Sequence, residues 1–272
     1  MIRIEGIEIK QGHFPDNSLM LKLQGEVYDK INEENIFLEW KYESDAELFT
    51  VICLRKHFAK RKMVLYMPYC PHARMDRVKS ACDVFTLKYF ADVINSLDFN
   101  FVLCADIHSN VAAALINNFY EIGQVYSNIR DTFELIKNAS DDNAIVCYPD
   151  EGAMKRNSEV ITAPYVFGVK KREWDTGKIT GLDLINKELV VGKDVLIVDD
   201  ICSRGGTFYH TAKALKEAGA NRVYLYITHC EKTILEGDLP TSGLIEQVFT
   251  TDSLFPDDIE TDFIAYVDKY FN

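Results

Sequence analysis

Two adjacent carboxylates stand directly before a loop whose residues suit an anion. The stretch VLIVDDICSRGGTF, residues 195 to 208, contains Asp199 and Asp200 and then the loop residues Ser203, Arg204, Gly205, Gly206 and Thr207. Glycines let the backbone turn so that N–H groups and a helix N-terminus face a phosphate, which the carboxylates would repel. A sugar phosphate suits both parts, because its hydroxyls donate to carboxylates while its phosphate lies in the loop. We therefore predict that the acids bind ribose and the loop binds its 5-phosphate.

The residues before the acids place them at the mouth of a site. Val195 to Val198 form an apolar run that predicts a central parallel strand buried on both faces. Ligands of open α/β sheets lie outside the carboxyl ends of such strands. The alternative is a plain helix entry in which Ser or Asp caps the helix. The combination of strand, paired acids and Gly-Gly-Thr favours the binding site.

Strands and helices alternate along the rest of the chain. MIRIEGIEIK predicts a strand pair or one bent strand. The pattern further predicts strands at 63–69, 100–108, 143–152, 165–174, 195–200 and 221–229, and helices at 46–62, 81–97 and 207–220. This order is typical of α/β units with open, mostly parallel sheets flanked by helices. It restarts between residues 137 and 142, which predicts domains 1–138 and 139–272.

Composition limits the partners and the compartment. The 272-residue chain has a formal net charge of −12, so we expect no nucleic-acid partner and a small anionic ligand. Its seven cysteines include no C-x-x-C pair and are typical of reduced, buried thiols, without zinc or disulfides. The charged N-terminus is unlike a signal peptide, and no apolar run could span a membrane. We expect a cytoplasmic protein without membrane contact.

VLIVDDICSRGGTF resembles the phosphoribosyl-pyrophosphate loop of the type I phosphoribosyltransferase fold. Base-transferring enzymes and ribose-phosphate pyrophosphokinases share that loop, but other motifs are similar to the pyrophosphokinases alone. HFPDNS at 13–18 is similar to their Phe-x-Asp-Gly-Glu motif, which implies that Phe14 and Asp16 contact the adenine of ATP in a neighbouring subunit. MPYCPHARMDR at 67–77 resembles their arginine segment. It implies ATP binding by Arg74, Asp76 and Arg77.

Further motifs follow in the family's order. CADIHSN at 104–110 places His108 beside the triphosphate and its Mg²⁺, and YPDEGAMKR at 148–156 implies that Asp150 belongs to the Mg²⁺ site. VKKRE resembles the flexible catalytic loop, which implies catalytic roles for Lys170 and Arg172. The resemblance covers residues 13 to 253. It implies two tandem type I phosphoribosyltransferase-like domains, with the ATP-binding elements in the first.

The implied activity is Mg²⁺-dependent transfer of a diphosphoryl group from ATP to the 1-hydroxyl of ribose 5-phosphate, by a homo-oligomer of at least two subunits. The chain departs from the family at His72, Met75 and Asn17-Ser18, and it has Arg204 where a threonine is usual. Because a guanidinium could reach a second phosphate, we hypothesise that ADP-ribose is an acceptor. Two alternatives are a base phosphoribosyltransferase, which would leave the N-terminal motifs unused, and a non-catalytic regulatory partner of a synthetase.

Overall fold

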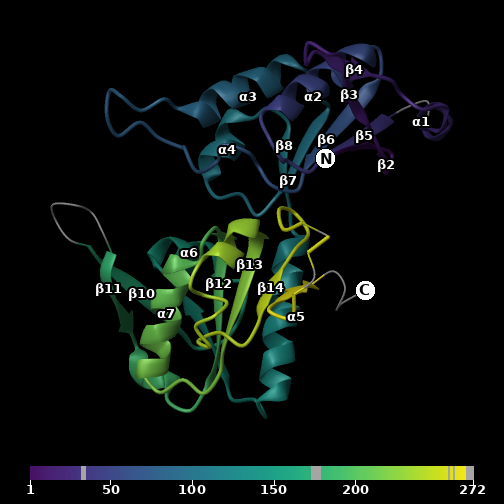
Figure 1. Cartoon of the computed structure of the whole chain (residues 1–272). Helices are drawn as coiled ribbons and strands as arrows, with labels where there is room; N and C mark the ends of the chain where they lie inside the picture. Colours follow the sequence, from purple (N-terminus) through teal and green to yellow (C-terminus); the bar gives the residue numbers. More distant parts are fainter. Residues whose placement is uncertain (32–34, 173–178, 257, 260, 268–272) are drawn as a thin grey trace. The chain divides into compact units, whose positions relative to one another are not determined.

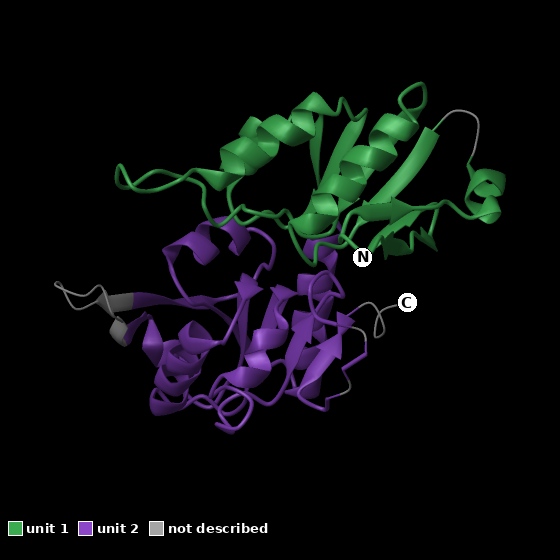
Figure 2. Ribbon diagram, turned by 45° about the horizontal axis from the view of Figure 1, so that its top comes forward, with its two compact units in different colours: residues 1–123 green, residues 124–272 purple. Residues whose placement is uncertain are grey.

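The chain folds into two units, residues 1–123 and 124–272, which are described separately (Figure 2). A computed structural model describes residues 1–31, 35–172, 179–256, 258–259 and 261–267. Each unit has its own sheet (Figure 1). Each also has its own buried hydrophobic cluster. No helix within the described ranges is both long and apolar enough to cross a membrane.

Unit 1 is an α/β unit with a mostly parallel sheet. Its elements are β1 (Ile2–Ile4), β2 (Ile7–Glu8), β3 (Gln11–His13), β4 (Leu19–Leu21), α1 (Gly25–Lys30), β5 (Asn35–Trp40), α2 (Ala46–His57), β6 (Lys62–Met67), α3 (Thr86–Ser96), β7 (Phe101–Ala105), α4 (Asn110–Leu115) and β8 (Phe119–Ile122). The sheet order is β2-β1-β5-β6-β7-β8, with β5 to β8 parallel, and β3 pairs with β4 in a separate hairpin. The predicted opening strand pair is confirmed by the antiparallel β1 and β2.

The helices of unit 1 differ from the sequence patterns at several points. Helix α3 begins at Thr86 and not at the predicted residue 81, because Asp83 accepts hydrogen bonds from the Lys79 and Ser80 amides in a loop before it. The short helices α1 and α4 were not predicted. Helix α3 buries Leu87, Phe90 and Ile94, whose spacing of three and four residues puts them on one face. Helix α2 begins at Ala46 as predicted but ends at His57 rather than at residue 62. The Arg61 amide donates to the Phe58 carbonyl and turns the chain into β6, so pairing of β6 with β5 ends the helix early.

Unit 2 has a larger sheet. Its elements are α5 (Gln124–Ala139), β9 (Ala144–Tyr148), α6 (Glu151–Asn157), β10 (Tyr165–Arg172), β11 (Ile179–Ile185), the 3-10 helix η1 (Lys187–Val190), β12 (Asp194–Cys202), α7 (Gly206–Glu217), β13 (Val223–Cys230), the 3-10 helix η2 (Lys232–Glu236), β14 (Val248–Thr250) and β15 (Ile264–Tyr266). The sheet order is β11-β10-β9-β12-β13-β14-β15, and only the β10–β11 pair in it is antiparallel among the described residues.

Strand β12 lies at the centre of this sheet and is buried on both faces, as predicted. Val195 and Ile197 pack in one hydrophobic cluster with Phe208 of α7. Leu196 and Val198, which point to the opposite face, are also fully buried. Helix α7 ends at Glu217, three residues before the end of the predicted helix, and Gly219 follows with a left-handed φ of 95°, which is typical of a glycine that closes a helix.

The division between the units differs from the predicted boundary at residue 138. Helix α5 contacts β9, β12 and β13 and therefore belongs to unit 2. Its buried face carries Ile129, Phe133 and Ile136.

The cysteines are free thiols and most are buried, but Cys82 is exposed because it lies in the loop before α3.

Candidate active site

Asp199 and Asp200 lie inside β12, since the strand continues to Cys202 instead of ending at the acids. Arg156 of α6 bridges the two carboxylates. Its Nη2 donates to Asp199 Oδ1 at 2.8 Å and to Asp200 Oδ1 at 2.6 Å. The side chain of Asp200 is only 2% exposed and that of Asp199 is 14% exposed. The structure thus holds two neighbouring carboxylates against one guanidinium.

The electrostatics of this pair are unfavourable for two full negative charges. Burial raises the pKa of Asp199 well above its ordinary value, and the adjacent charge of Asp200 raises it further. The Arg156 guanidinium opposes this rise, while the carboxylate of Asp150 adds to it. Ligand hydroxyls that donate hydrogen bonds would stabilise the charged carboxylates. The site is therefore suited to a diol such as the ribose 2- and 3-hydroxyls.

Helix α6 supplies both Arg156 and Asp150. Asp150 is its N-cap, where Oδ1 accepts a hydrogen bond from the Ala153 amide at 3.0 Å. A Cβ at Gly152 would lie 3.2 Å from that oxygen, so the glycine permits the close approach. Sequence reasoning identified Asp150 but missed the role of Arg156. Arg156 is the last residue of the stretch YPDEGAMKR, and its place on the same short helix as Asp150 was the signal that could have identified it.

The predicted phosphate loop connects β12 to α7. Gly205 has a left-handed φ of 78°, and Gly206 begins the helix. A Cβ at Gly205 would lie 3.0 Å from Leu239 Cδ2, so a larger residue would be crowded as well as strained. Thr207 lies half-buried in the first turn of α7. Backbone N–H groups at this turn and the positive end of the helix dipole are suited to an anion, as predicted for the 5-phosphate.

Ser203 and Arg204 contact the segment that follows β13. The Ser203 hydroxyl donates to Glu231 Oε1 at 2.7 Å, so in this arrangement its proton is directed at a carboxylate. The Arg204 guanidinium donates to Glu236 Oε2 at 3.0 Å and is 71% exposed. It therefore lies on the outer rim of the loop. Sequence reasoning did not identify Glu231 or Glu236.

In unit 1, the predicted ATP residues Arg74, Asp76 and Arg77 lie after β6, and His108 lies after the neighbouring strand β7. Asp76 joins the two connections, because its Oδ2 accepts from Ser109 Oγ at 2.8 Å and its Oδ1 accepts from Arg77 Nε at 2.6 Å. The Arg77 guanidinium holds the pKa of Asp76 below its ordinary value, and Ser109 and the nearby His108 contribute. Asp76 is thus a charged anchor that positions Arg77 beside the loop of His108.

Arg74 is exposed in the same connection after β6. His72, a departure from the family pattern, has a left-handed φ of 62° and contacts Asp45 Oδ1 through Nε2 at 3.0 Å. Asp45 also accepts from Tyr42 Oη at 3.0 Å, and burial, with Asp45 assisting, raises the pKa of Tyr42 to about 12. This network ties the arginine segment to the start of α2.

Phe14 and Asp16 lie in the turn of the β3–β4 hairpin. Phe14 is 52% exposed. Asp16 Oδ1 accepts from the hydroxyl and amide of Ser18, and these bonds hold the pKa of Asp16 below its ordinary value. The turn thus presents an aromatic ring and an ionised carboxylate to solvent, which is compatible with the predicted contact to another subunit.

Lys170 and Arg172 are in β10, where the Lys170 backbone pairs with Leu182 of β11. Their side chains, and the predicted loop after them, lie outside the described residues. No group of three or more His, Cys, Asp and Glu side chains in the described ranges could hold a metal by itself. Mg²⁺ commonly uses one or two carboxylates together with substrate phosphates and water. Asp150, at the mouth of the site, fits that kind of donor set.

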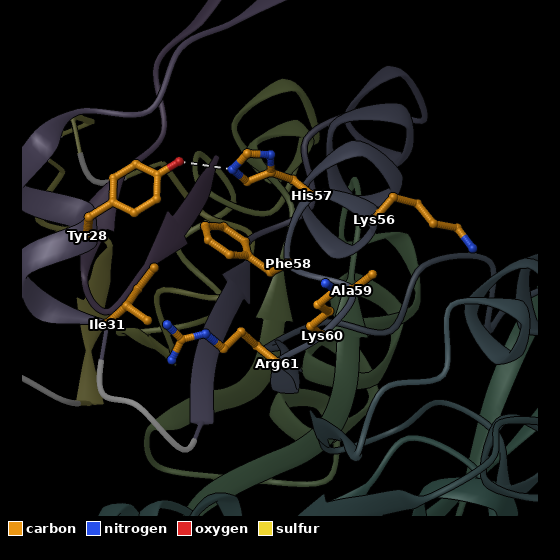
Figure 3. Close-up of a pocket in the computed structure, with 8 residues that line it drawn as sticks. All are labelled: Tyr28, Ile31, Lys56, His57, Phe58, Ala59, Lys60 and Arg61. Carbon is orange, nitrogen blue, oxygen red and sulfur yellow. Dashed lines mark hydrogen bonds between the residues drawn. The ribbon is translucent and has the colours of Figure 1, made fainter.

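A separate pocket of about 490 Å³ in unit 1 contains none of the predicted site residues. The basic stretch RKHFAKRK, residues 55–62, contributes Lys56, His57, Lys60 and Arg61 to its lining. Figure 3 shows Tyr28 joined to His57 by the hydrogen bond of 2.9 Å between Oη and Nε2. Part of this basic stretch therefore lines a concave surface.

Comparison with known proteins gives the family. A family model described as the phosphoribosyl transferase domain matches residues 117–253, about half of the chain. A ribose-phosphate pyrophosphokinase of Cereibacter sphaeroides is 30% identical over 247 residues, which cover 85% of this chain and 70% of that protein. The chain belongs to the ribose-phosphate pyrophosphokinase family. The predicted family is confirmed.

A second relative supports the same family, and a solved structure supports the fold. A ribose-phosphate pyrophosphokinase of Vibrio parahaemolyticus is 31% identical over 215 residues, which cover 76% of this chain and 66% of that protein. This pyrophosphokinase-family chain therefore spans about two thirds of the length of that relative. The crystal structure of phosphoribosylpyrophosphate synthetase from Mycobacterium smegmatis has a TM-score of 0.73 and 16% identity, and covers 95% of this chain and 85% of that chain. That similarity confirms the α/β fold.

Proposed function

We propose that the chain transfers the β,γ-diphosphoryl group of ATP to the 1-hydroxyl of a ribose 5-phosphate unit and releases AMP. The observation that carries this proposal is the pair Asp199 and Asp200, bridged by Arg156 beside a glycine loop that opens a helix. The pair suits the ribose hydroxyls, and the loop suits the 5-phosphate. A base phosphoribosyltransferase would use this half of the chain but leave the motifs of unit 1 without a role.

Catalysis in such a transfer consists mainly of positioning and charge neutralisation. The carboxylates of β12 would orient the ribose, and Arg74 and Arg77 would hold the phosphates of ATP with His108 beside them. Lys170 and Arg172 would act on the transferred group. Mg²⁺, held in part by Asp150 and His108, would neutralise the phosphate oxygens as charge develops on them. A homo-oligomer would bring Phe14 and Asp16 to the ATP of a neighbouring subunit.

ADP-ribose is a second candidate acceptor. Its 5-oxygen carries a diphosphate, so a second phosphate would extend beyond the loop that binds the first. The exposed Arg204 guanidinium on the outer rim, paired with Glu236, could reach that second phosphate without entering the tight turn at Gly205.

The test is an AMP assay with ATP and Mg²⁺, in which ribose 5-phosphate and ADP-ribose are offered separately. AMP from ribose 5-phosphate would support the ordinary acceptor, and AMP from ADP-ribose alone would support the larger one. If no AMP forms with either acceptor, the proposed reaction is contradicted and the interpretation as a regulatory partner is favoured.

An Arg204→Thr variant is expected to lose about tenfold in kcat/KM for ADP-ribose, because one charge-assisted contact on the rim is removed. Its kcat/KM for ribose 5-phosphate should change less than about twofold. The control is Arg130→Thr, which removes an exposed arginine from α5 and should change neither value. Equal losses with both acceptors would mean that Arg204 shapes the loop instead of binding a second phosphate.

A further inference from the structure

The phosphate loop is held from outside by the segment that follows β13. Strands β12 and β13 are parallel and in register, with Cys202 opposite Cys230. The pairing continues one step further, since the Glu231 amide donates to the Cys202 carbonyl at 2.8 Å. This register places the side chain of Glu231 next to Ser203, the first residue of the loop.

Glu231 is a half-buried carboxylate that accepts hydrogen bonds from two hydroxyls. Its Oε1 accepts from Ser203 Oγ at 2.7 Å, and its Oε2 accepts from Thr233 Oγ1 at 3.0 Å. A negative charge beside a phosphate site is electrostatically unfavourable for phosphate binding. Glu231 must therefore contribute through something other than its charge. Its hydrogen bond with Ser203 fixes the start of the loop.

The same segment contacts the loop at further points. A Cβ at Gly237 would overlap the Arg204 carbonyl oxygen, so the backbones approach closely there. Leu239 packs against Gly205, which adopts the left-handed conformation. These contacts surround the turn whose amides would face the phosphate. The conformation of the loop is therefore set by residues 231–239 before any ligand binds.

We propose that Glu231 is a positioning residue that, through Ser203, preorganises the phosphate loop for the ribose-phosphate acceptor. The proposal rests on the proposed function, since it assumes that the loop binds the acceptor's 5-phosphate. Preorganisation favours binding because less conformational freedom is lost when the ligand arrives. Glu231 itself does not touch the acceptor, and its effect passes through the hydroxyl of Ser203.

The test compares Glu231→Ala, Glu231→Gln and Ser203→Ala with the double variant Ser203→Ala/Glu231→Ala. Glu231→Ala is expected to raise the acceptor KM about tenfold, the equivalent of one hydrogen bond to a charged group. Its kcat and its KM for ATP should stay within about twofold of wild type. Glu231→Gln, which keeps one acceptor oxygen, should have an intermediate acceptor KM. The double variant should resemble Glu231→Ala, because both changes remove the same interaction.

The control is Glu134→Gln, which removes the carboxylate of an exposed ion pair with Lys137 in α5 and should change none of these values. An unchanged acceptor KM in Glu231→Ala would overturn the proposal. A lower kcat, a higher KM for both substrates and a lower Tm would also overturn the proposal, because together they indicate a general structural role.

Calorimetric binding of ribose 5-phosphate and ADP-ribose separates this proposal from the proposed reaction. If wild type binds an acceptor without forming AMP, the reaction is wrong, but weaker binding by Glu231→Ala would still support the positioning role. If Glu231→Ala binds as tightly as wild type, the positioning role alone is wrong. If wild type binds neither acceptor, the loop does not hold a ribose phosphate and both proposals fail.

Discussion

An Arg156→Met variant is expected to lose about 3 kcal/mol of unfolding free energy at pH 7, because it leaves buried carboxylates without their cation. Arg156 contacts Asp199 and Asp200 through one nitrogen, and the Asp200 side chain is 2% exposed. Methionine retains much of the length of the side chain but none of its charge. The measurement is denaturant unfolding in the absence of ligand.

Arg156→Lys is the matched control, because an ammonium group could still approach both carboxylates. It should retain a large part of the lost stability, although it lacks the planar fork of arginine. Equal losses in the Met and Lys variants would indicate that packing of the arginine stem, and not its charge, stabilises the site.

The stability deficit of Arg156→Met should shrink as the pH falls from 7 toward 5. In the folded protein, burial and Asp200 raise the pKa of Asp199, while Arg156 opposes the rise. Removing the arginine raises this pKa further above its unfolded value. The folded state then binds more protons than the unfolded state in this range, so stability falls as pH rises and recovers as pH falls. A deficit that is constant with pH would contradict this coupling.

The sequence predicted the parts of the site that depend on local pattern. The apolar run Val195 to Val198 is typical of a buried parallel strand, and the glycines after it predict a turn into a helix. Both are found, with Gly205 in the left-handed conformation. The order of motifs also predicted the family. These features could be inferred because a few consecutive residues determine them.

The missed residues depend on pairing between distant segments. Glu231 lies beside Ser203 only because β12 and β13 pair with Cys202 opposite Cys230. Arg156 reaches the acids from a helix 43 residues earlier in the chain. Neither the register of parallel strands nor the direction of a helix is contained in local periodicity. The division between the two units also depends on such distant packing, because α5 belongs to unit 2 through its contacts with β9, β12 and β13.

An Asp199→Asn variant is expected to gain stability while losing activity. Asparagine has the same shape, but it removes a charge that burial and Asp200 disfavour, and Arg156 keeps its contact with Asp200. The expected gain is about 1 kcal/mol of unfolding free energy, typical of relieving strain at a functional site. Denaturant unfolding without ligand measures this gain.

The same variant should lose about 100-fold in kcat/KM for the acceptor, since two ribose hydroxyls lose a charged hydrogen-bond acceptor worth about 1.5 kcal/mol each. AMP formation at varied acceptor concentration measures the loss.

Asp194→Asn is the matched control, because Asp194 lies in the same strand and is 1% exposed, but its carboxylate accepts from Arg222 and Asn221. Its substitution should lower stability and leave the acceptor KM unchanged. If Asp199→Asn instead destabilised the protein as Asp194→Asn does, the carboxylate would be a structural ion-pair partner. A gain in stability with Asp199→Asn and a loss with Asp194→Asn would mean that Asp199 is retained at a cost to the stability of the fold because its charge binds the acceptor.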